Sequence, residues 1–113
     1  MKEYQLYING EFIESESKQT FDSINPFNQD TIAKVSRANV ADTQKAILSA
    51  RNAFDNSDWK NISGNERAAM LKAVSDKINE KKNELEILEV EDSGSTLRKA
   101  KEDVFLSARN MNS

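Results

Sequence analysis

The chain has 113 residues, of which 37% are hydrophobic and 31% are charged, and its net charge is −3. This length fits one domain with a thin core, and the acidic balance argues against the basic surface that nucleic-acid binding requires. The sequence has no cysteine and no histidine. Disulfides, thiol nucleophiles, Cys/His metal sites and Ser-His-Asp catalysis are therefore excluded within these residues.

The first residues, MKEYQLY, lack the apolar core of a signal peptide. No segment approaches the roughly 18 apolar residues that a membrane span needs. We therefore expect a cytoplasmic protein with neither a membrane partner nor a nucleic-acid partner.

A β-hairpin is predicted close to the start of the chain. In residues 4–8, positions 4, 6 and 8 are apolar, which is the period of two expected of a half-buried strand. Asn9-Gly10 can adopt the positive φ angles of a type I′ turn. Residues 11–13 then return as the antiparallel partner.

Residues 1–37 as a whole are predicted to be mainly strands. After a polar loop at 14–19, residues 20–24 and 31–36 form two further extended segments. Asn25-Pro26 separates them, because proline disfavours helix in the residue before it and cannot donate to a strand ladder.

Residues 38–113 are predicted to be mainly helical, with three or four helices. Asn39 caps the first, and Asp42 completes a weaker form of the capping box. A loop at 55–62 follows, and Ser63 to Glu66 then form an S-x-x-E capping box for the second helix. The third covers about 84–92 and ends at a glycine cap, Gly94. The fourth carries apolar residues at Leu97, Ala100 and Val104.

Strands followed by helices, without β-α-β alternation, predict an α+β fold. The three glycines lie at positions 10, 64 and 94, so neither G-x-G-x-x-G nor a P-loop is present. Glycine-based phosphate binding is therefore not expected from this chain.

The adjacent carboxylates Glu91-Asp92 and Glu102-Asp103 are interpreted as solvated helix surface, because neighbours on a helix point in different directions.

Several other side chains have two interpretations. Arg67 could bind a phosphate or a carboxylate through its planar guanidinium, but we favour a structural role near the apolar face of its helix. Trp59 could mark a ligand site, but a lone tryptophan between helices is more often a packing anchor. Tyr4, Tyr7 and Phe12 could form an interaction surface around the hairpin, although at least half of them are expected to face the helices.

Taken together, these residues resemble the N-terminal segment of the aldehyde dehydrogenase superfamily. The resemblance extends over nearly the whole chain, and each motif has modest specificity by itself. EDSGSTLRKA is most similar to benzaldehyde- and vanillin-type members. The matching residues are Ile8 to Phe12, Asn25-Pro26, Ile32, Val35, Ala38, Asp42, Ala46, Ala50-Arg51, Phe54, Trp59, Glu66-Arg67, Leu71, Glu91, Gly94, Ala100 and Asp103-Val104.

The resemblance implies a partial aldehyde dehydrogenase fold spanning residues 1–113. Family members are NAD(P)-dependent oxidoreductases that convert aldehydes to carboxylic acids, using a cysteine nucleophile, a glutamate base and an asparagine amide. All three lie far beyond the segment that this chain matches. The resemblance therefore gives these residues no catalytic and no cofactor-binding role, and NAD or NADP is implied only for a full-length member.

The resemblance also implies one weak site. Some relatives hold a structural monovalent cation with a carboxylate at the position of Asp103, helped by residues that correspond to Ser23 and Ile24. A hard cation needs several oxygen ligands, and the others would come from beyond this segment.

We expect an N-terminal dehydrogenase fragment, either truncated or isolated, that is inactive alone. Apolar faces such as Leu71, Val74 and Ile78 should be exposed, and such patches drive association. The expected partners are the remainder of a dehydrogenase or further copies of this chain. The alternative is a non-catalytic binding or regulatory module that associates with a full-length dehydrogenase.

Overall fold

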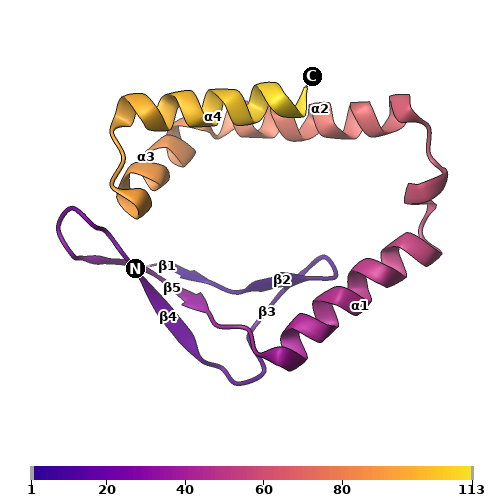
Figure 1. The fold of residues 1–113 in the computed structure, drawn as a ribbon, viewed down its shortest axis with the longest axis horizontal. Helices are drawn as coiled ribbons and strands as arrows, with labels where there is room; N and C mark the ends of the chain where they lie inside the picture. Colours follow the sequence, from indigo (N-terminus) through magenta and orange to yellow (C-terminus); the bar gives the residue numbers. More distant parts are fainter. Residues whose placement is uncertain (1, 113) are drawn as a thin grey trace. The chain divides into compact units, whose positions relative to one another are not determined.

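The computed structural model describes residues 2–112, which form five short strands and four α-helices (Figure 1). The α+β prediction is confirmed. The chain divides into two compact units. The first contains the residues up to Ile24 together with Asp30–Asn61, and the second contains Asn25–Gln29 and the residues from Ile62 onward.

The predicted hairpin is confirmed in the first unit. Strand β2 (Leu6–Ile8) pairs antiparallel with β3 (Glu11–Ile13). Asn9 and Gly10 connect them with φ angles of 55° and 77°, as a type I′ turn requires.

The prediction of one continuous strand over residues 4–8 is wrong, because the chain changes sheets at Gln5. Strand β1 (Lys2–Tyr4) pairs parallel with β5 (Thr31–Ser36), whereas β2 begins only at Leu6. β5 is the central strand of a three-stranded sheet. Strand β4 (Thr20–Ile24) pairs antiparallel on its other side, with an irregularity between Ser23 and Ile24.

Helix α1 (Val40–Asn56) begins at the predicted Asn39 cap. The Asn39 side chain accepts a hydrogen bond from the Asp42 backbone N–H at 2.9 Å, and Asp42 Oδ2 accepts one from the Asn39 N–H at 3.0 Å. The loop predicted at 55–62 is too long. The helix continues to Asn56, and a short 3-10 helix, η1 (Asp58–Asn61), follows.

The second unit contains three helices: α2 (Gly64–Glu80), α3 (Lys82–Ser93) and α4 (Leu97–Met111). Ser63 caps α2 by accepting the Glu66 N–H at 3.1 Å. α3 is longer than predicted and ends at Gly94, which has the left-handed conformation of a C-terminal cap.

Figure 1 shows α4 running alongside α2 in the opposite direction. The buried Ser75 hydroxyl donates to the Ala108 carbonyl oxygen at 2.7 Å and joins these two helices.

The turn after β4 belongs to the helical unit. The Asn25 side chain accepts the Phe27 N–H at 2.9 Å, and its carbonyl oxygen accepts the Gln29 N–H at 2.8 Å. Pro26 packs against the end of α3, because a Cβ built on Gly94 would lie 2.7 Å from Pro26 Cγ. Glycine is required here by close packing as well as by its φ of +72°.

Candidate functional site

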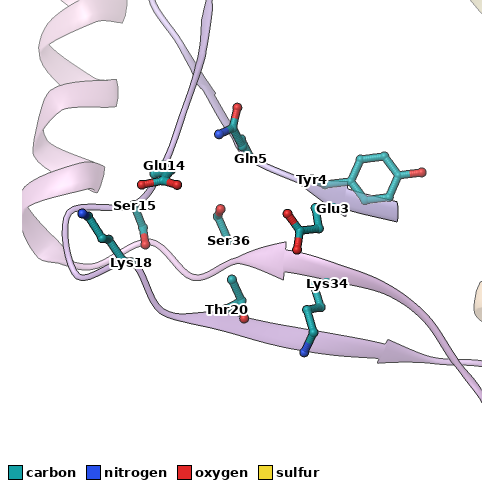
Figure 2. A pocket seen from close by; sticks show the side chains of 9 residues that line it. All are labelled: Glu3, Tyr4, Gln5, Glu14, Ser15, Lys18, Thr20, Lys34 and Ser36. Atoms are coloured by element: carbon teal, nitrogen blue, oxygen red, sulfur yellow. The ribbon is translucent and has the colours of Figure 1, made fainter. Parts of the chain in front are cut away.

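A polar hollow of about 210 Å³ opens in the first unit where the chain passes between its two sheets (Figure 2). Glu3 and Lys34 come from paired positions on β1 and β5, and Glu14 and Lys18 come from the β3–β4 loop. Lys34 also donates to Asp22 on β4 at 3.1 Å. Figure 2 shows the Tyr4 ring pointing away from the other labelled side chains.

This hollow contains both charge signs and hydroxyl groups but no activated nucleophile. Ser15 is buried, and its hydroxyl donates to the Gln19 carbonyl oxygen at 3.3 Å. It therefore stabilises the loop between β3 and β4. No histidine or cysteine exists in the chain to activate a hydroxyl. The hollow suits water and ordinary polar contacts better than covalent chemistry.

Asp42 is the most deeply buried carboxylate of the first unit, at 1% exposure. Its two oxygens accept the Glu16 backbone N–H at 3.1 and 3.3 Å, and Oδ2 also accepts the Asn39 N–H. Asp42 thus holds the loop after β3 against the start of α1. The sequence indicated the capping role, but not the contact with Glu16, which is 26 residues away.

Asp103, the predicted cation ligand, lies on α4 in the second unit. It accepts a hydrogen bond from Lys99 Nζ at 2.8 Å, one helical turn earlier. This hydrogen bond and the negative charge of Asp103 raise the pKa of Lys99 above its ordinary 10.5, and the charges of Glu89 and Glu102 act in the same direction. The carboxylate is thus already neutralised by a lysine.

Within residues 2–112, no group of three or more acidic or other metal-ligating side chains could hold a metal ion. Ser23 and Ile24 belong to the first unit, and Asp103 belongs to the second. The cation site at Asp103 therefore stays a prediction.

The other singled-out side chains are spread over both units. Arg67 is half-buried on α2, in a hollow that Leu71 and Met111 also line. Trp59 lies in η1 and stays exposed.

Tyr7 and Phe12 form a ring pair with centroids 4.8 Å apart, and their side chains are 64% and 72% exposed. Tyr4 is exposed as well, so the expectation that at least half of these three rings face helices is wrong.

Two of the three glycines, Gly10 and Gly94, have positive φ angles that serve backbone geometry. Gly10 forms the hairpin turn, Gly64 begins α2 and Gly94 ends α3. None of them opens a helix directly after a strand, the position that a dinucleotide-binding glycine loop occupies. The three glycines therefore do not form a dinucleotide-binding loop.

Comparison with known proteins decides the family. The model of the "Aldehyde dehydrogenase family" matches residues 12–113. This chain belongs to that family. Betaine aldehyde dehydrogenase of Bacillus subtilis (strain 168) is 42% identical over 99 residues, which are 88% of this chain and 20% of that protein. Mitochondrial 10-formyltetrahydrofolate dehydrogenase of Homo sapiens is 39% identical over 92 residues, 81% of this chain and 10% of that protein.

Solved aldehyde dehydrogenases have the same fold over this segment. The NAD-dependent aldehyde dehydrogenase from Sinorhizobium meliloti superposes with a TM-score of 0.94 over 97% of this chain at 27% identity. Betaine aldehyde dehydrogenase from Staphylococcus aureus in complex with NAD+ gives 0.93 over 96% at 37% identity. This chain covers 22% of each of those chains. It corresponds to an N-terminal portion of the family's fold.

The chain spans a fifth or less of the length of the two curated relatives named above. None of the helices in the described part is long and apolar enough to cross a membrane.

Proposed function

We propose that this chain is the N-terminal segment, residues 1–113, of an NAD-dependent aldehyde dehydrogenase that oxidises aldehydes to carboxylic acids in the cytoplasm. The observation that carries the proposal is the superposition with the Sinorhizobium meliloti enzyme over 97% of the chain. NAD is proposed over NADP because the similar solved structures are an NAD-dependent enzyme and a dehydrogenase in complex with NAD+.

These 113 residues alone are proposed to be inactive. The chain has no cysteine for a thiolate nucleophile, and its glycines do not form a phosphate cradle. Its role is instead to complete the fold of the dehydrogenase. The proposed partner is the remainder of the dehydrogenase polypeptide, because many large apolar side chains on these helices stay exposed, among them Leu71, Val74 and Phe105.

The substrate is an aldehyde whose identity this segment does not determine. Betaine aldehyde is one candidate, from the names of two relatives. A benzaldehyde- or vanillin-type aldehyde is a second, and it rests only on the sequence Gly94-Ser95-Thr96 between α3 and α4.

A chimera tests this proposal. The 113 residues replace the matching segment of the Staphylococcus aureus betaine aldehyde dehydrogenase, and NADH formation from NAD and betaine aldehyde is followed by absorbance. We expect the chimera to form NADH, and both the isolated chain and the enzyme lacking its own segment to form none. A folded chimera without activity, or NADH formation by the isolated chain, would contradict the proposal.

A further inference from the structure

The turn of the β2–β3 hairpin exposes a chemically reactive pair of residues. Asn9 and Gly10 are both exposed, and apart from the chain neighbours no atom lies within 4 Å of the place that a Cβ on Gly10 would take. Asn9 is also the one asparagine in the 113 residues that a glycine follows. Because glycine has no side chain, nothing shields the Gly10 backbone nitrogen from the amide carbon of Asn9.

We propose that Asn9 is a site of spontaneous deamidation and isoaspartate formation. The Gly10 backbone nitrogen attacks Asn9 Cγ, a new C–N bond forms, and a succinimide ring closes. The Cγ–Nδ2 bond breaks, and the side-chain nitrogen leaves as ammonia with the proton that the Gly10 N–H gives up. A water molecule then opens the ring. Aspartate results when the bond from the Gly10 nitrogen to Cγ breaks, and isoaspartate results when its bond to the Asn9 carbonyl carbon breaks.

The attack needs a local opening of the turn, and the hairpin is built to open easily. β2 and β3 have three residues each and form a two-stranded sheet of their own. A hairpin of this kind is only marginally stable in water. Its ring pair, Tyr7 and Phe12, is itself exposed. Elements with so little buried apolar surface open locally more often than the whole chain unfolds.

Ser49 on α1 restrains the reacting amide. Its hydroxyl donates to Asn9 Oδ1 at 3.5 Å, which is the outer limit of a hydrogen bond. This contact ties the amide to α1, so the tie has to break before the amide can close on Gly10. Because the hydrogen bond is long and weak, Ser49 slows the reaction without preventing it.

The isoaspartate product changes the backbone as well as the charge. Its main chain runs through the former side chain and is longer by a methylene group, whereas the aspartate product only adds a negative charge. A two-residue hairpin loop fixes the register of its strands, and here it places Ile8 opposite Glu11. The longer backbone does not fit this turn, so β2 loses its pairing with β3 in the isoaspartate form.

Incubation of the 113-residue chain at mildly alkaline pH tests the site. Peptide mass spectrometry follows the mass gain of each asparagine with time, and electron-based fragmentation distinguishes isoaspartate from aspartate. Asn56, which is exposed and is followed by Ser57, is the comparison within the same chain. We expect Asn9 to convert at least about tenfold faster than Asn56, because a Cβ on the following residue hinders the attack. Equal or slower conversion of Asn9, or a product without isoaspartate, would overturn the proposal.

Two variants separate the parts of the proposal. Asn9→Gly keeps a residue that accepts positive φ and removes the amide, so the acidic species that forms fastest should disappear. Ser49→Ala should speed the conversion of Asn9 about threefold, as the loss of a weak hydrogen bond predicts. Ser107→Ala, which removes a hydroxyl that donates to the Asp103 carbonyl oxygen on α4, is the matched control. An unchanged or slower rate with Ser49→Ala would refute the restraint.

Hydrogen exchange tests the consequence for the hairpin. The isoaspartate form is separated from the parent chain by ion-exchange chromatography, and deuterium uptake is compared in peptides that cover residues 6–13. We expect these peptides to lose their protection, because the β2–β3 hydrogen bonds no longer form. Peptides from α4 should be unchanged. Equal protection of residues 6–13 in the two forms would contradict the loss of pairing.

Discussion

At the scale of single residues, one residue in each unit joins segments that lie far apart in the sequence, Asp42 in the first unit and Gly94 in the second. Asp42 connects the loop after β3 to the start of α1 through three backbone contacts. Gly94 lets the Asn25–Gln29 turn pack onto the end of α3. Because each of these residues joins segments that are far apart in the sequence, we expect even a small change of its side chain to lower the free energy of unfolding.

Asp42→Asn should destabilise the first unit by about 1–3 kcal/mol, because an amide has only one acceptor oxygen for the buried N–H groups that the carboxylate satisfies. The free energy of unfolding is measured by urea denaturation monitored by circular dichroism. Asp55→Asn, which removes only the exposed ion pair with Arg51 at 2.9 Å, is the control and should cost at most a few tenths of a kcal/mol. Equal effects of the two substitutions would contradict this role of Asp42.

Gly94→Ala should destabilise the second unit by at least about 1–2 kcal/mol, the cost of left-handed backbone for a residue with a Cβ. The contact of the new methyl group with Pro26 adds to that cost. Gly64→Ala is the control, because nothing lies within 4 Å of a Cβ at that position. Thermal melting distinguishes them: we expect a lower Tm for Gly94→Ala alone, and an unchanged Tm would disprove the packing argument.

At the scale of elements, local sequence signals mark the hairpin turn and several helix ends of this chain. The Asn9-Gly10 turn and the caps at Asn39, Ser63 and Gly94 were all predictable, because each depends on residues within one turn. The parallel pairing of β1 with β5 was not, since it joins Lys2 to Ala33. No local pattern marks the change of sheet at Gln5 either.

The candidate site was less predictable than the elements. The ion pair of Asp103 with Lys99 follows the i, i+4 spacing of a helix and was accessible from the sequence. The hollow beside Glu3 and Glu14 was not, because β1 and the β3–β4 loop meet only through tertiary structure. The catalytic apparatus could be inferred only from the family, since this segment contains no cysteine or histidine to suggest one.

The Lys99–Asp103 pair gives α4 a stability that depends on pH. Folding raises the pKa of Lys99, so the pair stabilises the helix fully below the unfolded pKa of about 10.5 and loses this effect as pH rises through the folded value. Lys99→Gln should therefore lower Tm at neutral pH, and the difference from the parent chain should vanish at strongly alkaline pH. Lys101→Gln is the control. A difference that persists at high pH would contradict the assignment.

At the scale of the whole molecule, the described residues bury little apolar surface. Among residues 2–112, the buried hydrophobic side chains are Ala33, Ala100 and Ala108, whereas the large apolar side chains of α1, α2 and α4 are mostly exposed. Burial of large apolar side chains is the main stabilising contribution to folding. The central claim is therefore that these exposed faces are interior surfaces of a larger dehydrogenase fold.

Sedimentation velocity of the isolated 113-residue chain over a wide dilution series tests this claim most directly. Exposed apolar patches of this extent favour association. We predict species larger than a monomer whose population falls on dilution. A monodisperse monomer at every concentration, with a cooperative unfolding transition, would show that these helices need no further polypeptide and would contradict the account.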